Sequence, residues 1–417
     1  MRRDVTPARR TPRRESETRR ARDARRTSAT RDMTTRANRG ATATATTTRM
    51  KTKMKMKMKM KTASTRATSS SDASSSAAAA KDEEDDCVLA TKCARMANFV
   101  YKGGGVESWM ADDGLQTKAR GVTGATGWCV CDDVERNARF IVVRGAAWSQ
   151  PDTDRNKLSW QIAKIWPQAL RKDRKTPVVC HQGVYEMVEE FWRDLVPWLS
   201  DETFDGTYYF TGHSLGGSMG LVVAARAREL GLEEARVGGV YTFGAPPVLA
   251  YDRLAGNGPG SSIDDEPEVG MDEILRLVGF TRGASLVKQY VLAKDVIPRM
   301  WLSADPVFVA ATKTDFIGGL LDWRRETFGE GMFTKNRFLY ESIGDLYWLE
   351  YADGEQGKPT LSRYGGDDVL TKLRMNLDDI TQSPLTAWQT IGDHNSQAYV
   401  DALQFLTIRR VINPSKR

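Results

Sequence analysis

One short segment, Gly212-His213-Ser214-Leu215-Gly216, constrains the fold of this chain more than any other feature. An apolar run at residues 208–211 precedes it, and small and apolar residues follow from 217. A strand, a sharp glycine-lined turn and a helix would hold the serine hydroxyl above a sheet, with the helix N-terminus facing the reacting group. The pentapeptide alone is a weak signal, and a glycine-rich turn with an incidental serine is the alternative. Its context predicts Ser214 as a nucleophile.

A serine hydroxyl needs a base, and the base must be oriented by a carboxylate. The chain has three histidines. His213 lies inside the turn, where its side chain is expected to point away from the Ser214 hydroxyl, and His181 precedes the nucleophile. The order serine, acid, histidine that accompanies such a turn selects His394 as the base. The alternative for His394 is an exposed loop histidine.

Asp295 is the predicted acid. Residues 286–293 form an apolar run typical of a strand, and Asp295 follows its C-terminal end, where α/β sheets place functional groups. Asp379 and Asp393 are rivals in less regular regions. Asp393 is also too close to His394 in sequence to reach the far side of the ring comfortably.

Apolar runs alternate with helical patterns along most of the chain. Strands are expected at residues 140–143, 208–211, 237–243 and 286–293, and helices at 159–170, 186–199, 217–229, 272–278 and 396–408. This alternation indicates a mostly parallel sheet covered on both faces, as in the α/β-hydrolase fold with its nucleophile elbow. Residues 338–340 and 346–351 further predict a hairpin around Gly344.

Charge divides the chain into a basic tail and an acidic body. The whole chain carries +7, but residues 1–80 hold 22 basic and 6 acidic side chains, which leaves −9 for residues 81–417. The tail has no Trp, Tyr or Phe, so it cannot bury enough apolar surface to fold. We therefore expect a disordered segment over 1–80, with the acidic residues 81–86 as a linker.

The composition of the tail also predicts its role. Residues 33–71 are rich in Ser, Thr, Ala, Lys and Arg and contain no Asp or Glu, as in an organelle transit peptide. A start at Met33 would remove acidic residues that fit this interpretation poorly. A basic arm with another role is the alternative, and the lack of aromatic residues argues against a nucleic-acid partner. Composition alone does not separate chloroplast from mitochondrion.

Several other classes of protein are excluded. No apolar run approaches the roughly 18 residues of a membrane span. The five cysteines form an odd set in a long chain, which indicates reduced thiols rather than a disulfide framework. Cys129 and Cys131 would share one face of a strand, where a redox pair is conceivable but a zinc site lacks a second pair of ligands. No metal or cofactor is expected.

Several motifs, taken in order, resemble the class 3 lipases and cover residues 138–407. They are Cys180-His181-Gln182-Gly183-Val184-Tyr185, Gly212-His213-Ser214-Leu215-Gly216-Gly217, Tyr241-Thr242-Phe243-Gly244-Ala245-Pro246, Asp295-Val296-Ile297-Pro298-Arg299, and Asp393-His394 followed by Tyr399. The resemblance, together with the organelle-type tail, is greatest to plant and algal plastid lipases. It implies an N-terminal part at 81–137 and a lipase domain at 138–417, with a lid at about 147–175 and an insert at about 301–393.

The resemblance also implies roles for individual residues. Ser214 would attack the ester carbonyl, His394 would shuttle the proton, and Asp295 would orient His394. The oxyanion would be held by the backbone N–H groups of Leu215 and Ala146. Class 3 lipases usually carry a hydroxyl residue where this chain has Ala146, and losing one donor can lower the rate on the order of 100-fold or more.

The expected lid carries apolar residues between basic flanks, which suits a lipid surface. The residues expected to contact lipid are Trp160, Ile162, Ile165 and Trp166. A helix packed on the sheet with solvated flanks is the alternative. The resemblance thus implies a serine-dependent, A1-type lipase acting on plastid galactolipids or phospholipids, peripherally bound to membrane. The alternatives are a triacylglycerol lipase, a soluble carboxylesterase, or a catalytically silent lipid-binding homologue. The expected location is the chloroplast, with the mitochondrion or the cytoplasm as alternatives.

Overall fold

A computed structural model gives the structure of the chain. It describes residues 72–102, 105–165, 167–171, 176–251, 270–299, 340–351, 358–374 and 393–412. The expected disordered tail up to residue 71 and most of the expected insert at 301–393 lie outside these ranges. Residues 68–417 form one compact unit, to which all the described residues belong.

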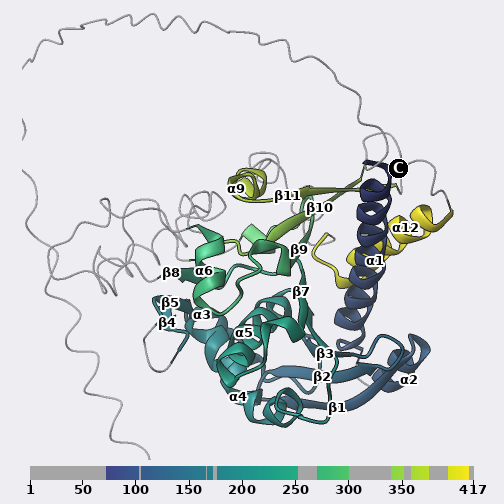
Figure 1. Ribbon diagram of the computed structural model, residues 1–417. Coiled ribbons are helices and arrows are strands. Elements are labelled where there is room, and N and C mark those ends of the chain that lie inside the picture. Colours follow the sequence, from purple (N-terminus) through teal and green to yellow (C-terminus); the bar gives the residue numbers. More distant parts are fainter. Residues whose placement is uncertain are drawn as a thin grey trace, which may run out of the picture. The chain divides into compact units, whose positions relative to one another are not determined.

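Within the described residues, an eight-stranded sheet carries the fold, in the order β1-β2-β3-β6-β7-β9-β10-β11 (Figure 1). Neighbouring strands from β3 to β10 pair in parallel, and the strands added outside them are antiparallel. This arrangement confirms the predicted mostly parallel α/β sheet. The strands are β1 Leu115–Thr123, β2 Thr126–Asp133, β3 Ala138–Val143, β6 Thr207–His213, β7 Val237–Phe243, β9 Val287–Leu292, β10 Asp345–Tyr351 and β11 Pro359–Tyr364.

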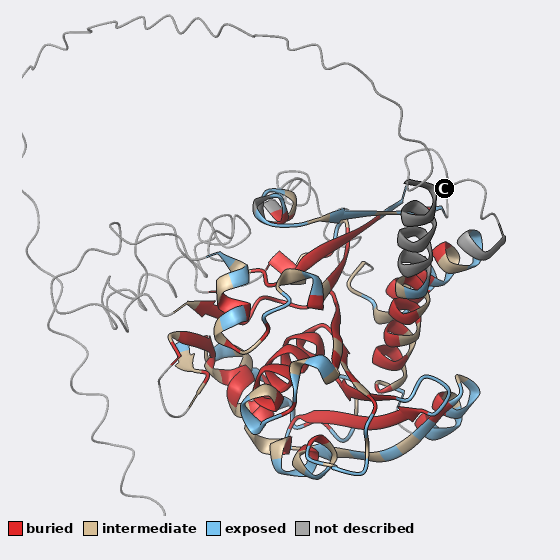
Figure 2. Cartoon of the chain, in the orientation of Figure 1, coloured by how far each residue is buried: buried red, intermediate tan, exposed pale blue. Residues whose placement is uncertain are grey.

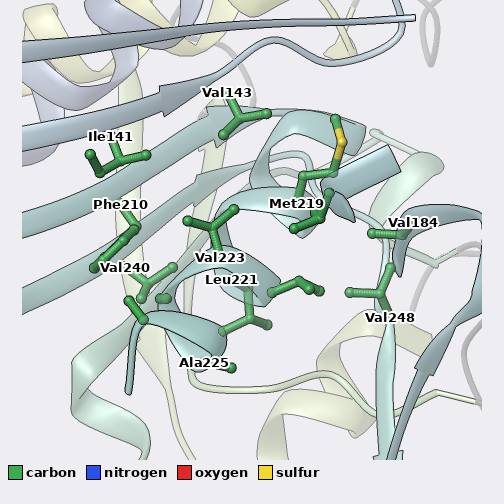
Figure 3. Packing of buried hydrophobic residues seen from close by; sticks show 14 of the residues in the cluster. Ile141, Val143, Val184, Phe210, Met219, Leu221, Val223, Ala225, Val240 and Val248 are labelled. Atoms are coloured by element: carbon green, nitrogen blue, oxygen red, sulfur yellow. The ribbon is translucent and has the colours of Figure 1, made fainter. Parts of the chain in front are cut away.

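Helices cover both faces of this sheet, and most residues of the central strands are buried (Figure 2). On one face α5 packs against the inner strands, with Met219, Leu221 and Val223 of α5 beside Ile141 and Phe210 (Figure 3). On the other face α1 packs against β6 and α12. The helices are α1 Asp72–Phe99, α2 Val106–Asp112, α3 Arg155–Ala163, α4 Gln182–Leu199, α5 Leu215–Leu230, α6 Met271–Leu277, α9 Asp367–Arg374 and α12 Ser396–Ile412, with short 3-10 turns η1 Glu234–Arg236, η3 Ala284–Leu286 and η4 Ile297–Arg299.

The helix expected at residues 159–170 is only partly correct. Helix α3 begins earlier, because the Asp154 side chain caps it by accepting a 3.0 Å hydrogen bond from the Lys157 N–H. It ends at Ala163, since Pro167 lacks an N–H and disfavours a helical residue before it. Strand β4 (Pro167–Ala169) follows and joins β5 (Val178–His181) and β8 (Leu249–Tyr251) in a small second sheet.

The hairpin expected around Gly344 is wrong in its pairing. Strand β10 forms where predicted, but its antiparallel neighbour is β11 rather than residues 338–340. Glu341 instead bridges Leu249, and residues 338 and 339 lie outside the described ranges. Gly344 has φ 101° and its position leaves no space for a side chain against Val287. It therefore feeds the chain into the sheet beside β9 rather than turning it back on itself.

The acidic segment 81–86 is helical rather than a linker, because it forms part of α1. Its last residue, Asp86, accepts a 2.7 Å hydrogen bond from the Tyr241 hydroxyl and pairs with Lys288. The acidic segment that follows the basic tail therefore ends in a residue that contacts the sheet. The expected boundary at 137 is not a structural division either, since β2 pairs directly with β3.

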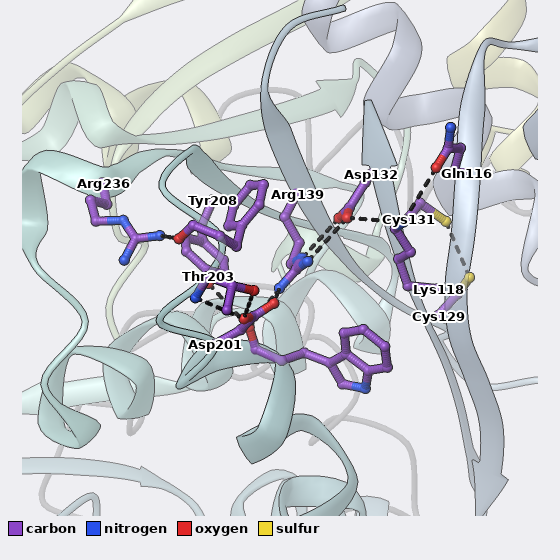
Figure 4. Close-up of polar contacts among 12 residues, drawn as sticks. Gln116, Lys118, Cys129, Cys131, Asp132, Arg139, Asp201, Thr203, Tyr208 and Arg236 are labelled. Atoms are coloured by element: carbon purple, nitrogen blue, oxygen red, sulfur yellow. Dashed lines mark hydrogen bonds and ion pairs between the residues drawn. The ribbon is translucent and has the colours of Figure 1, made fainter. Parts of the chain in front are cut away.

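A buried arginine of β3, Arg139, lies at the centre of a cluster of ion pairs (Figure 4). The Arg139 side chain is 4% exposed, donates two hydrogen bonds to Asp132, and donates a third, of 3.0 Å, to Asp201. Hydrogen bonds from Thr203 and from Arg139 lower the pKa of Asp201 to about 2. This cluster ties β2 and β3 to the turn that follows α4.

The five cysteines are free and buried, which agrees with the predicted reduced thiols. The Sγ atoms of Cys129 and Cys131 lie 3.3 Å apart on one face of β2. The bond between the two thiols, and burial, raise the pKa of Cys129 above its usual value. Such a thiol is a poor nucleophile. No helix among the described residues has the length and apolarity to cross a bilayer.

Candidate active site

Ser214 occupies the sharp turn between β6 and α5. Its φ of 57° and ψ of −137° lie in a region that non-glycine residues rarely adopt. Strain of this kind is held at functional sites by the surrounding packing. A side chain at Gly216 would overlap the Val143 carbonyl, and one at Gly212 would lie 2.5 Å from the Gly216 oxygen. The turn therefore requires both glycines, and the predicted strand–turn–helix is confirmed.

The three residues singled out by chain order lie within hydrogen-bond distance of one another. His394 Nε2 lies 2.8 Å from Ser214 Oγ, and His394 Nδ1 lies 3.0 and 2.9 Å from the two Asp295 oxygens. Asp295 follows β9 and is fully buried, while His394 stands just before α12. This is the geometry of an activated serine nucleophile.

The rival residues occupy other positions. Asp393 accepts a 3.1 Å hydrogen bond from the Lys294 N–H, and Asp379 lies outside the described residues. His181 caps α4, where its Nδ1 accepts a 3.3 Å hydrogen bond from the Val184 N–H. The ring of His213 lies 4.7 Å from the ring of His394. Within the described residues, His394 is the histidine whose ring nitrogen lies within hydrogen-bond distance of Ser214 Oγ.

Tyr399 supports Asp295 from the first turn of α12. Its hydroxyl donates a 2.6 Å hydrogen bond to Asp295 Oδ2 and accepts one of 3.1 Å from the Leu292 N–H. The Ile297 N–H donates to the other Asp295 oxygen at 2.9 Å. Burial raises the pKa of Tyr399 well above 10, and so does the Asp295 charge, which keeps the phenol a donor. Tyr399 was named in the motif that contains His394, but no role was predicted for it.

Tyr101, at the end of α1, is a second residue that sequence reasoning missed. Its hydroxyl lies 3.2 Å from His213 Nδ1 and 3.3 Å from the His213 carbonyl oxygen. Burial lowers the pKa of His213 well below 6.5, and the neighbouring His394 lowers it further. His213 is therefore neutral beside a residue that must accept a proton. No motif in the sequence links the N-terminal residue Tyr101 to this site.

The segment after β3 runs directly beside Ser214. A side chain at Gly145 would lie 2.5 Å from the His213 carbonyl oxygen and 3.1 Å from Ser214 Cβ. Arg144 anchors this segment through hydrogen bonds of 3.1 and 3.2 Å to Asp152. Ala146 follows Gly145, and Leu215 is the first residue of α5. Both expected oxyanion donors therefore belong to backbone segments that adjoin Ser214.

The residues expected to contact lipid do not share one environment. Trp160 is 72% exposed, Ile162 is half-buried, and Ile165 is buried, with its carbonyl accepting a 2.9 Å bond from the Tyr340 hydroxyl. The burial of Ile165 therefore argues against the expected contact of its side chain with lipid. Trp166 lies outside the described residues, as do residues 172–175 of the basic flank.

Two lysines of the basic flanks pair with acids of α4. Lys157 lies 2.9 Å from Glu190, and Lys164 pairs with Glu186. Exposed pairs of this kind have little free charge left to attract an anionic surface. Trp148 and Trp160, both exposed, are the apolar features of this segment that face solvent. No group of His, Cys, Asp or Glu suited to a metal ion occurs within the described ranges.

Comparison with known proteins shows what the segment around this site is similar to. Residues 145–258, which include Ser214 and its turn, match the sequence model of the class 3 lipases. The chain also resembles two Arabidopsis thaliana proteins: a chloroplastic phospholipase A1, PLIP1, 26% identical over 66% of this chain, and PLIP2, also a chloroplastic phospholipase A1, 23% identical over 75%. It spans about two fifths of their lengths, 40% and 42%.

Solved structures of lipases are similar as well. A Rhizomucor miehei triacylglyceride lipase has a TM-score of 0.44 at 18% identity, covering 73% of this chain and 92% of its own. A fungal lipase–inhibitor complex has a TM-score of 0.46 at 17% identity, covering 76% of this chain and 97% of its own.

Proposed function

We propose that this chain is a serine-dependent lipase that hydrolyses acyl esters of glycerolipids. The observation that carries the proposal is the hydrogen-bonded series Ser214–His394–Asp295 at a strained strand-to-helix turn. A buried carboxylate, an imidazole and a serine hydroxyl in that order supply a nucleophile, a base and an orienting charge. The class 3 lipase match over residues 145–258 supports the same reaction.

The proposed reaction has two halves. Ser214 Oγ attacks the ester carbonyl carbon while its proton passes to His394 Nε2, and Asp295 stabilises the resulting imidazolium through Nδ1–H. The backbone N–H groups of Leu215 and Ala146 hold the oxyanion. The intermediate then collapses, and His394 gives the proton to the departing glyceryl oxygen. Water, deprotonated by His394, attacks the acyl-enzyme and releases the fatty acid and the free serine.

We propose a plastid glycerolipid, cleaved at the sn-1 position, as the substrate. The names of the Arabidopsis relatives, both chloroplastic phospholipases A1, support this choice. The transit-type composition of residues 1–80 supports delivery to the chloroplast. The exposed Trp148 and Trp160 support peripheral contact with a lipid surface, because an indole ring favours the membrane interface.

A defined lipid panel tests this function. The purified chain is incubated with phosphatidylglycerol, galactolipids and triacylglycerol, and the released fatty acids and lysolipids are identified by mass spectrometry. We expect sn-2 lysolipids from a polar glycerolipid and no product from Ser214→Ala, since loss of such a nucleophile lowers kcat roughly a millionfold. Release from triacylglycerol alone, or from short soluble esters alone, would contradict the proposed substrate. Equal release by the Ser214→Ala protein would contradict the mechanism.

A further inference from the structure

A cleft of about 390 Å³ lies between the β1–β2 hairpin, helix α2 and the segment after β3. Its volume is within the roughly 300–1,000 Å³ of small-molecule sites. Arg120 pairs with Cys129 and Val122 pairs with Gly127 across the hairpin, so these alternate positions present one face of the sheet as a floor. Val100 and Val106 form one wall, and Arg144 with Asp152 forms the other.

The cleft is mostly apolar, and glycines make it hollow. Val100, Val106 and Cys129 are buried in its lining, and Val122 is 45% exposed at its rim. Gly127 leaves the floor open, because a side chain there would lie 2.9 Å from Arg144 Nε. Lining of this composition suits a hydrocarbon chain rather than a strongly polar molecule.

One polar group in the lining is unsatisfied. Arg144 is 2% exposed, and its two terminal nitrogens donate to Asp152 and Thr153. Its Nε–H is buried and has no hydrogen-bond partner among the described residues. A buried donor without an acceptor is costly and uncommon. Nε lies beside Gly127 in the lining and is closed to solvent, so a molecule in the cleft would have to shift the Arg144 side chain for one of its oxygen atoms to accept from Nε.

We propose that this cleft binds a long-chain fatty acid, with its hydrocarbon chain along the Val100–Val106 wall and its carboxylate accepting from Arg144 Nε. The cation at the rim, Arg120, supports an anionic headgroup there, although Glu107 shares it. The choice of a fatty acid rests on the proposed function, because ester hydrolysis releases this acid. Arg144 leads directly into Gly145 and Ala146, so the bound product would adjoin the segment beside Ser214.

Photo-crosslinking to the inactive Ser214→Ala protein tests the site without requiring hydrolysis. A long-chain fatty acid with a diazirine in its chain is bound, irradiated, and mapped by peptide mass spectrometry. We expect adducts in the peptides that contain Val100, Val106 and Val122, and loss of these adducts when excess unlabelled fatty acid competes. Adducts confined to residues near Ser214, or to the exposed Trp148 and Trp160, would overturn the proposal.

A pair of matched variants supplies the control. Val122→Trp places an indole in the cleft and should lower labelling about tenfold, because the ring occupies the space of the acyl chain. Val134→Trp makes the same change at a 63% exposed valine outside the cleft and should keep the labelling. Equal labelling of both variants would overturn the proposal, as would displacement by a lysophospholipid but not by fatty acid. If the unmodified chain, with Ser214 intact, failed to hydrolyse lipids, that result would contradict the proposed function but not the binding of a fatty acid in this cleft.

Discussion

Asp295 is a fully buried carboxylate, and its charge is tolerated because His394, Tyr399 and the Ile297 N–H all contact it. A hydrogen bond to a charged group is worth about 1.5–3 kcal/mol. Tyr399→Phe removes one such bond while keeping the ring, so Asp295 should orient His394 less firmly. We expect kcat on a soluble ester to fall about 10- to 100-fold with little change in KM.

Tyr364→Phe is the matched control for this change, since Tyr364 lies on β11 and has no bond to Asp295. Steady-state kinetics of both variants decide the matter. Unchanged kcat in Tyr399→Phe would show that the contact with Asp295 has no part in the reaction.

Because His213 is buried and neutral, we expect the folded state to lose stability as the pH falls below 6.5. The folded pKa of His213 lies well below 6.5, because burial disfavours the charged ring. Above pH 6.5 neither state is protonated and His213 has no effect. As the pH falls below 6.5, the unfolded chain binds a proton that the folded chain does not, so the folded state loses up to about 1.4 kcal/mol per pH unit. His213→Gln should therefore flatten this decline.

Denaturant unfolding of the two proteins at pH 7, 6 and 5 measures the effect. Other groups titrate in both proteins, so the difference between their slopes isolates His213. Identical slopes would mean that the buried ring is protonated as readily as in the unfolded chain.

At the scale of elements, the turn from β6 to α5 depends on the absence of side chains. Gly216→Ala would place a methyl group against the Val143 carbonyl and 2.7 Å from the Gly145 N, both backbone atoms that cannot move aside. Overpacking of this kind costs roughly 1–3 kcal/mol or more. We expect loss of ester hydrolysis together with a lower unfolding temperature.

Gly220→Ala, one helical turn further along α5, is the control. The nearest atom to its new methyl group would be the Thr211 carbonyl oxygen, at an ordinary 3.6 Å. Alanine in a helix interior is more favourable than glycine by roughly 0.5–1 kcal/mol, so this variant should be active and slightly more stable. Destabilisation of both variants to the same extent would refute the role given to the turn.

The sequence predicted well those strands and helices whose hydrophobic pattern lies within the element itself. Strand β7 has the predicted bounds, Val237–Phe243, and the helix predicted at residues 186–199 lies within α4, Gln182–Leu199. The errors concern long-range partners. Periodicity extended a helix from residue 159 to residue 170, whereas α3 ends at Ala163. The antiparallel partner of β10 is β11, which follows it along the chain, whereas the predicted partner, residues 338–340, precedes it.

The same distinction applies to the site. Ser214, Asp295 and His394 could be found because each follows or precedes a recognisable element and their order along the chain is informative. Tyr101 and Tyr399 could not be assigned, because their roles depend on how α1 and α12 meet the sheet. Such contacts arise only from tertiary packing.

At the scale of the molecule, the N-terminal helix belongs to the fold. Helix α1 buries Cys87, Ala90, Cys93, Met96 and Ala97 against the sheet and α12. Fully burying a large apolar side chain contributes about 1.5–3 kcal/mol, and a whole domain is stable by only about 5–15 kcal/mol. Removing residues 1–102 should therefore prevent folding, whereas removing residues 1–67 should leave the unfolding temperature unchanged.

Thermal unfolding followed by circular dichroism compares these two truncations with the full chain. Cooperative unfolding of a protein that begins at residue 103 would contradict the structural role of α1. A large loss of stability on removing residues 1–67 would contradict their assignment to a separate unit.

The net charge of residues 81–417 and the ion pairs of the basic flanks together indicate how the chain would associate with a membrane. The net −9 of residues 81–417 would be repelled by an anionic membrane, and Lys157 and Lys164 are paired with Glu190 and Glu186. Apolar contact through Trp148 and Trp160 is therefore the more plausible basis for association with a lipid surface.

The central claim is that Ser214 is a nucleophile activated by His394, and covalent labelling tests it most directly. A fluorophosphonate is attacked by an activated serine and forms a stable adduct that intact mass and peptide mapping locate. The account predicts one adduct per chain, at Ser214, with none in Ser214→Ala and labelling slowed at least about 100-fold in His394→Ala. An adduct at another residue, or equal labelling rates with and without His394, would contradict it.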